Sequence, residues 1–238
     1  MKPSWYALER GGWRDYVTLL HLPYTAWHLS YVVIGGCLAP VMRWDRLGAV
    51  VAAFALALGI GAHALDELRG RPLRTTIPER VLIALAVVSI AGACAIGLAG
   101  AAAWSWWLAL LVAAGTFLVL AYNLELFGGL LHTDLWFGLA WGGFPVLTGY
   151  AVVAGELDVV AGLAAAFAVV LSLAQRVLST NVRFVRRRVA AVRGELELAE
   201  GGREQLDESR LVAADETALM LLGAATVLLA AALVAFRV

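Results

Sequence analysis

The sequence carries little charge and almost no lysine. Of its 238 residues 15% are charged, whereas a soluble domain usually has about 25% charged residues. The 18 basic and 18 acidic residues cancel, so the overall charge argues against a nucleic-acid partner or an acidic partner. Because 62% of the residues are hydrophobic, the composition excludes an ordinary soluble domain and predicts a polytopic membrane protein.

Cysteine is also scarce. Cys37 and Cys94 both lie inside apolar runs, so we expect two small core residues rather than a disulfide or a metal-binding pair. The first twenty residues are of mixed polarity and carry four aromatic residues. No cleavable signal is therefore expected at the start of the chain.

Long apolar runs are abundant. A helix needs roughly 20 apolar residues to cross the hydrocarbon core of a bilayer, and its backbone groups must be hydrogen-bonded within the helix. The runs predict an all-α, polytopic membrane bundle of about seven transmembrane helices. The predicted helices cover 22–42, 47–67, 81–100, 104–123, 135–154, 157–179 and 216–236. Only a few small residues separate the third from the fourth, which predicts a tight helical hairpin.

This pattern divides the chain into three parts. Residues 1–180 are predicted to form a six-helix membrane bundle with a short cytoplasmic N-terminus. Residues 181–214 form a cytoplasmic segment that is first basic and then acidic. Residues 215–238 form a C-terminal transmembrane helix.

Arginine placement predicts the orientation, because cytoplasmic loops are enriched in Lys and Arg. With the N-terminus inside, fifteen of the 18 basic residues fall on the cytoplasmic side. Arg43, Arg46 and Arg237 fall outside. We therefore expect a protein of the cell inner or plasma membrane, with its N-terminus in the cytoplasm and its C-terminus outside.

The predicted orientation brings polar residues of several helices into the cytoplasmic half of the membrane. His63, Asp66 and Glu67 can share one face at the inner end of the second helix, because they are three and four residues apart. Ionisable groups at membrane depth are costly and indicate function. These three residues are candidate catalytic residues, and the two carboxylates are candidate metal ligands. His28, near the inner start of the first helix, is a candidate substrate-binding residue.

The connection after the fourth helix reaches the same side. Asn123, His132 and Asp134 lie in it and are further candidates for substrate binding. Simpler roles stay open for some of these residues. Asp66 and Glu67 can cap the following loop and pair with its arginines, and Thr133 or Asp134 can cap the fifth helix.

Segment 181–212 is the longest polar stretch. Val182, Val185 and Val189 recur at helical spacing between arginines. This spacing predicts a basic amphipathic helix on the inner leaflet, with anionic membrane lipid as its partner. After Gly194 the composition turns acidic, and a solvated helical linker is expected there.

Two stretches resemble the UbiA-type membrane prenyltransferases. RPLRT at 71–75 follows an acidic helix end, and FGLAWGGFPVLTGY at 137–150 is similar to a helix typical of that family. Members of the family are helix bundles with two aspartate-rich motifs, which bind Mg²⁺ and the diphosphate of a polyprenyl donor. The resemblance covers roughly residues 20–185 and implies a UbiA-like fold.

The resemblance also implies roles for individual residues. Asp66 matches the closing aspartate of the first motif and His63 replaces an earlier one, so Asp66 and Glu67 would bind Mg²⁺. Tyr122 stands where the family has a tyrosine. The position of the second motif holds Asn181 and no aspartate. Arginines follow there that could bind phosphate oxygens directly, namely Arg183, Arg186 and Arg187.

Three functions fit these residues. The first is a divergent prenyltransferase that moves an isoprenoid group from a prenyl diphosphate to a small acceptor, with Mg²⁺ as cofactor. The second is an enzyme for a lipid-soluble substrate in which histidines and carboxylates bind a transition metal such as zinc, iron or manganese. The third is a non-catalytic lipid-binding or assembly protein on the same scaffold. No oligomeric state is predicted.

Overall fold

Six helices are long and apolar enough to cross a membrane within residues 4–238, which are the residues that the computed structural model describes. The predicted all-α bundle is confirmed, and these six helices indicate a multi-pass membrane protein. They are Trp44–Leu68, Glu79–Trp104 (α5), Trp106–Asn123, Asp134–Ala154, Val159–Arg188 (α9) and Glu208–Arg237 (α10).

Three of the six helices are built from shorter pieces. The first consists of α3 (Trp44–Phe54), the π-helical stretch η1 (Ala55–Ala62) and α4 (His63–Leu68). The third consists of the 3-10 turn η2 (Trp106–Leu108) and α6 (Ala109–Asn123). The fourth consists of α7 (Asp134–Phe137), the π-helical stretch η4 (Gly138–Gly143) and α8 (Phe144–Ala154). Single π-helical turns are rare and often occur at functional sites.

The first predicted segment, 22–42, forms a shorter helix than expected. Helix α2 covers Leu22–Cys37 and has 16 residues. It ends three residues before Pro40, which has no backbone N–H to continue a helix. At about 1.5 Å per residue α2 is about 24 Å long, less than the roughly 30 Å of a bilayer core. A seventh transmembrane helix therefore stays a prediction.

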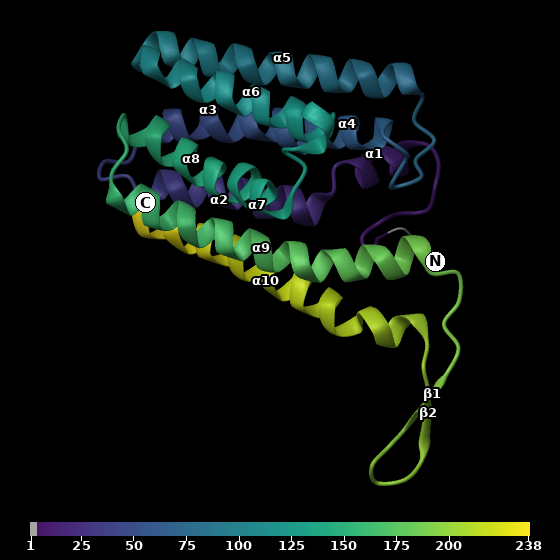
Figure 1. The fold of residues 1–238 in the computed structure, drawn as a ribbon. Helices are drawn as coiled ribbons and strands as arrows, with labels where there is room; N and C mark the ends of the chain where they lie inside the picture. The colour runs from purple at the N-terminus through teal and green to yellow at the C-terminus, as the bar shows by residue number, and fades with distance from the viewer. Residues whose placement is uncertain (1–3) are drawn as a thin grey trace.

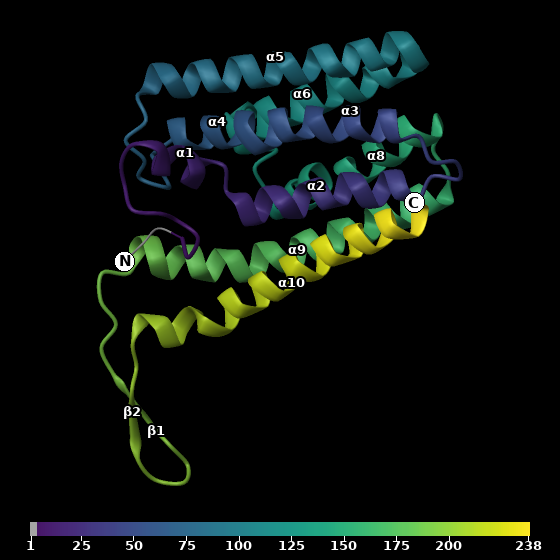
Figure 2. The ribbon, with the colours of Figure 1, turned by 180° about the vertical axis from the view of Figure 1, so that it is seen from behind.

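The helices lie side by side in layers (Figure 1). Helices α5 and α6 form one outer layer, α9 and α10 form the opposite one, and α2, α3 and α8 lie between them, as the view from behind also shows (Figure 2). Helix α5 ends at Trp104 and η2 begins at Trp106, with Ser105 alone between them. The predicted tight hairpin is confirmed.

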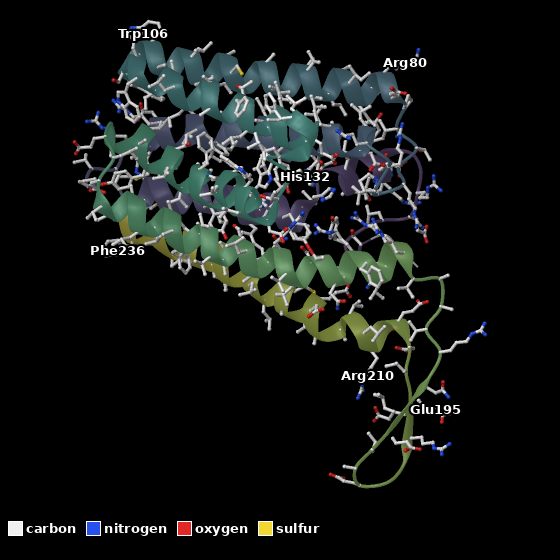
Figure 3. All side chains as sticks on the ribbon, in the orientation of Figure 1. Arg80, Trp106, His132, Glu195, Arg210 and Phe236 are labelled. Carbon is white, nitrogen blue, oxygen red and sulfur yellow. The ribbon has the colours of Figure 1, made fainter. Side chains whose placement is uncertain are left out.

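Polar structure gathers at one end of the bundle. Helix α1 (Trp13–Leu19), the loop after α4 and the start of α5 at Arg80 lie at this end, whereas Trp106 and Phe236 lie at the other (Figure 3). We call it the arginine-rich end and define it by residues 4–21, 66–80 and 176–210. His132 lies further in, well away from both ends of the bundle (Figure 3).

Asp15 ties α1 to the loop after α4. Its carboxylate accepts hydrogen bonds from the backbone N–H of Gly11 (2.9 Å) and from the backbone N–H and hydroxyl of Thr76 (2.6 and 2.5 Å). Burial opposes ionisation of Asp15, but these bonds outweigh it and lower the pKa of the carboxyl below its ordinary value. The N-terminal segment is thereby held beside the loop 69–78.

Helices α2 and α8 cross at glycines. A Cβ atom on Gly35 would lie 2.1 Å from the carbonyl oxygen of Val146, and one on Gly149 would lie 2.1 Å from the carbonyl oxygen of Val32. Both obstacles are backbone atoms of the opposite helix. The close approach of the two helices therefore requires a residue without a side chain at each position.

Replacing Gly149 by alanine is expected to destabilise the protein by about 2 kcal/mol, because the two backbones must separate to admit a methyl group. The midpoint of thermal unfolding in detergent measures the effect. Gly48→Ala is the matched control, since a Cβ on Gly48 in α3 meets no atom within 4 Å. An equal loss of stability in both variants would contradict the close crossing.

The segment after α9 departs from the sequence prediction. The expected helical linker is instead an antiparallel hairpin of β1 (Glu195–Glu197) and β2 (Arg203–Gln205), which projects from the arginine-rich end (Figure 1). Glycines Gly201 and Gly202, with φ of 86° and 105°, form its turn. The alternation of glutamate and leucine at 195–198 has the period of a strand, which the prediction of a helix there overlooked.

The predicted amphipathic helix at the start of segment 181–212 is also corrected. Its residues belong to the last turns of α9, which runs to Arg188. Val182 and Val185 are buried against Val212 and Leu219 of α10. A neighbouring helix, rather than a lipid surface, therefore covers this apolar stripe.

Candidate functional site

A polar cavity of about 410 Å³ lies inside the bundle next to the arginine-rich end. The N-terminal segment, α2, η1, α4, α6, η4 and α9 all contribute to its wall. All four histidines of the chain line it, together with six charged residues. These residues are His21, His28, His63, His132, Asp66, Arg69, Glu125, Arg176, Arg183 and Arg187.

Helix α9 contributes one continuous stripe to the wall. Gln175, Ser179, Arg183 and Arg187 are four residues apart and all line the cavity. Residues at this spacing lie above one another on a helix surface. The stripe therefore runs from the glutamine deep in the bundle to the arginines at the arginine-rich end.

Among the residues that the structure describes, some arginines of the cavity wall form ion pairs with carboxylates and others do not. Arg69 forms an ion pair with Glu125 (3.1 Å), and Arg176 forms one with Asp134 (2.8 Å). Arg183 and Arg187 form no ion pair within residues 4–238. These two guanidinium groups are consequently the cations available to an anionic ligand.

Asp66 and Glu67 have different environments, although they are adjacent. Asp66 lines the cavity, and its carboxylate forms no hydrogen bond or ion pair within the described chain, 4–238. Glu67 is fully buried and accepts hydrogen bonds from the backbone N–H groups of Leu73 and Thr75 and from the hydroxyl of Thr75 (3.0, 2.8 and 2.8 Å). The structure therefore places Glu67 against the loop and outside the cavity, which corrects its expected place beside Asp66 as a catalytic residue and metal ligand.

Two histidines of the wall are oriented by the π-helical stretches. His28 Nδ1 lies 2.8 Å from the carbonyl oxygen of Trp141 in η4, and His63 Nδ1 lies 3.1 Å from the carbonyl oxygen of Gly59 in η1. A carbonyl oxygen only accepts, so each Nδ1 carries the proton and donates it. The lone pair of each ring is then on Nε2.

Tyr6 and His21 close the cavity at the arginine-rich end. The hydroxyl of Tyr6 and Nδ1 of His21 are 2.9 Å apart, and the His21 ring stacks on that of His63 with centroids 4.2 Å apart. Burial raises the pKa of Tyr6. Burial and, to a smaller extent, the neighbouring His63 lower the pKa of His21 well below its ordinary value. Both residues are therefore neutral at pH 7.

Of the residues predicted in and next to the connection after the fourth predicted helix, three line the cavity and Asp134 does not. Tyr122, Asn123 and His132 line it. Nδ1 of His132 donates to the carbonyl oxygen of Tyr122 (3.1 Å), and the side-chain amide of Asn123 donates to the carbonyl oxygen of Val119 (2.7 Å). Asp134 lies outside the wall, where it pairs with Arg176. Of the two predicted caps, Thr133 is confirmed, since its hydroxyl oxygen accepts a hydrogen bond from the Trp136 N–H at the start of α7.

Two residues expected at the second motif position face away from the cavity. Arg186 forms a two-pronged ion pair with Glu216 of α10, one contact of which is 2.7 Å. The Asn181 side chain donates to Asp215 and to the carbonyl oxygen of Leu211 (2.5 and 3.3 Å). Both residues join α9 to α10 and do not line the cavity, so their expected role in substrate binding stays a prediction.

Several residues of the cavity are absent from the sequence prediction. Tyr24, Gln175 and Ser179 line the wall but were not among the candidates. The four-residue spacing from Gln175 to Arg187 was the signal that could have found two of them, because it extends the arginine face of α9 inward.

An apolar groove adjoins the cavity inside the bundle. It has a volume of about 110 Å³ and is lined by α3, η1, α5, α6 and α8. Leu58 and Trp141 line both spaces, so the cavity and the groove share a wall. Small residues four apart form much of the groove, namely Ala49, Ala53 and Ala57 on one side and Ala93, Gly97 and Ala101 on the other.

Buried polar atoms without partners concentrate at the cavity. Within residues 4–238, six buried side-chain nitrogen or oxygen atoms have no hydrogen-bond partner. Four of them belong to residues of the cavity wall, namely Trp5 Nε1, the Tyr122 hydroxyl, Gln175 Oε1 and Arg187 Nε. Since buried polar groups are normally hydrogen-bonded, this cavity suits a polar ligand.

No three His, Cys, Asp or Glu side chains of residues 4–238 form a group that could hold a metal ion. Comparisons of the chain with protein-family models, with curated proteins and with solved structures find no match.

Proposed function

We propose that this protein is a divergent UbiA-like membrane prenyltransferase, which transfers an isoprenoid group from a prenyl diphosphate to a small acceptor. One observation carries the proposal: the arginine-lined cavity and the apolar groove share a wall at Leu58 and Trp141. A prenyl diphosphate has an anionic head and an apolar tail. Adjoining polar and apolar spaces suit such a molecule.

Arg183 and Arg187 are proposed to bind the diphosphate. Both are free of ion pairs within residues 4–238, and Arg187 Nε lacks a hydrogen-bond partner. The tail would lie in the groove between α3 and α5. From Leu58 to Val50 the groove follows eight residues of helix, or about 12 Å at the usual rise per residue. This length favours a short isoprenoid over a long polyprenyl chain.

The proposed transfer breaks one bond and forms another. The bond between the allylic carbon and the diphosphate oxygen breaks, and its electron pair leaves with the diphosphate. The nucleophilic atom of the acceptor forms a bond to that carbon, and the proton of that atom passes to the released diphosphate. Fixed guanidinium groups beside the leaving oxygen stabilise the charge that develops there.

Asp66 is the residue that fits the expected Mg²⁺. Proteins commonly hold this ion through one or two carboxylates together with substrate phosphates and water, and the Asp66 carboxylate faces the cavity. A bound Mg²⁺ supplies neutralisation of the diphosphate charge. Glu67 does not fit as a second ligand, since its oxygens bind Leu73 and Thr75.

The arginine-rich end is proposed to face the cytoplasm. The bias of Arg and Lys toward this end supports the assignment. It would give the cavity access to a water-soluble acceptor and would place the C-terminus on the outer side.

The test compares farnesyl diphosphate with its two halves, farnesol and inorganic diphosphate. Binding to the purified protein in nanodiscs is followed by tryptophan fluorescence, because Trp5 and Trp141 line the cavity. We expect farnesyl diphosphate to bind at least about tenfold more tightly than either half, since it gains both contacts. Farnesol binding as tightly as farnesyl diphosphate would contradict a diphosphate site.

A non-catalytic lipid-binding protein is the second candidate. It is favoured by the position of the second motif, which holds arginines and no carboxylate. Release of inorganic diphosphate from bound farnesyl diphosphate, in the presence of a panel of phenols and indoles, separates the two candidates. Prenylated product supports the enzyme, and binding without release supports the lipid-binding protein.

A further inference from the structure

The stripe of α9 that lines the cavity begins with two guanidinium groups and ends, further in, with a side-chain amide that can accept hydrogen bonds. Arg183 and Arg187 lie toward the arginine-rich end of α9, and Gln175 lies two to three turns further in. Gln175 is 5% exposed, and its Oε1 has no hydrogen-bond partner within residues 4–238. A buried amide oxygen without a partner points to a ligand that donates a hydrogen bond.

Two more acceptors line the cavity. His28 lies seven residues further along α2 than His21, and His63 lies about one turn deeper than Asp66. Both rings are buried, both line the cavity, and neither Nε2 forms a hydrogen bond within the part of the chain that the structure describes. Since Nδ1 of each ring donates to a π-helical carbonyl, Nε2 presents a lone pair.

We propose that His28, His63 and Gln175 form a second subsite, which binds a neutral small molecule through its own O–H or N–H group. The subsite adjoins the groove wall, because His28 Nδ1 donates to the carbonyl oxygen of Trp141, which lines both spaces. The inference rests on the proposed function in one respect: this molecule would be the acceptor, held next to the allylic carbon where head and tail of the donor meet.

The three acceptors select against charged ligands. An anion would bring its charge toward three lone pairs and offer no donor. A buried cation needs a carboxylate partner, and the carboxylate of Asp66 lies on the arginine side of His63. A neutral hydroxyl or N–H compound satisfies the acceptors without either cost.

The experiment uses phenol and anisole, which differ in the O–H donor. They are added to full-length protein labelled with ¹⁵N-histidine in detergent micelles, without any prenyl diphosphate. NMR then reports which ring nitrogen of each histidine carries the proton. We expect His28 and His63 to be protonated at Nδ1, and phenol to shift both Nε2 resonances while anisole leaves them in place.

Variants assign the contacts. His63→Asn keeps a side-chain donor for the carbonyl oxygen of Gly59 but has no counterpart of Nε2, so it separates the helix contact from the ligand contact. Gln175→Met keeps the length of the side chain and removes the acceptor. Each variant is expected to weaken phenol binding by about three- to tenfold, the usual effect of one lost hydrogen bond. Gln205→Met, in β2 and outside the cavity, is the matched control and should change nothing.

The outcomes separate this inference from the proposed function. Protonation of His28 and His63 at Nε2, or equal binding of phenol and anisole, would overturn the subsite even if farnesyl diphosphate binds. A phenol-specific shift in a protein that does not bind farnesyl diphosphate would support the subsite and refute the prenyltransferase.

Discussion

Replacing Arg183 and Arg187 together by glutamine is expected to weaken binding of farnesyl diphosphate by about 100-fold or more. A hydrogen bond to a charged group contributes about 1.5–3 kcal/mol, and each 1.4 kcal/mol is a tenfold change in affinity. Both guanidinium groups lack an ion pair within residues 4–238, so their removal leaves no carboxylate unpaired. The fold should therefore be retained, and the loss should appear in binding alone.

The matched control for this pair is Arg188→Gln. Arg188 follows Arg187 directly, is exposed and does not line the cavity. The Arg188→Gln substitution removes one positive charge from the same turn of α9 without removing a proposed contact to the diphosphate. An affinity that falls equally in R188Q and R187Q would show that farnesyl diphosphate responds to general charge and not to the two guanidinium groups of the cavity.

Glu67→Ala is expected to lower the free energy of unfolding by about 3 kcal/mol or more. Each buried donor left without a partner costs about 1–3 kcal/mol, and Glu67 satisfies the two N–H groups of Leu73 and Thr75 and the hydroxyl of Thr75. Glu67→Gln should cost less, because one acceptor oxygen remains. Thermal unfolding in detergent measures both variants.

Glu200→Ala in the exposed hairpin turn is the control for the loss of a carboxylate and should leave the unfolding midpoint unchanged. A different result for Glu67→Gln would assign Glu67 another role. If Glu67→Gln unfolds like the wild type but no longer binds farnesyl diphosphate in the presence of Mg²⁺, then Glu67 acts as a metal ligand and its role in the loop is secondary.

The fold was largely predictable from apolar runs. Six of the seven predicted segments correspond to helices long enough to span a membrane, because the length of an apolar run is a local property. The hairpin of β1 and β2 was missed, although glutamate and leucine alternate through 195–198. The acidic composition after Gly194 suits an exposed strand as well as a solvated helix, so composition alone does not distinguish the two.

The candidate site was predictable only in part. His28, His63, Asp66 and Arg183 were singled out and do line one cavity. Gln175 was overlooked, although its four-residue spacing from Ser179, Arg183 and Arg187 places it on the arginine face of α9. Only the packing of the helices shows that this face lines a cavity.

By itself, the sequence determined that this chain is a bundle of apolar helices with arginines gathered at one end. Lipid offers no partner to backbone groups, so a long apolar run has to be helical. The tertiary structure alone decided which polar side chains meet. Adjacent residues on a helix point about 100° apart, so Asp66 faces the cavity while Glu67 faces the loop. Arg187 likewise faces the cavity while Arg186 faces α10. Neighbouring helices fix that rotation, and no local pattern in the sequence records it.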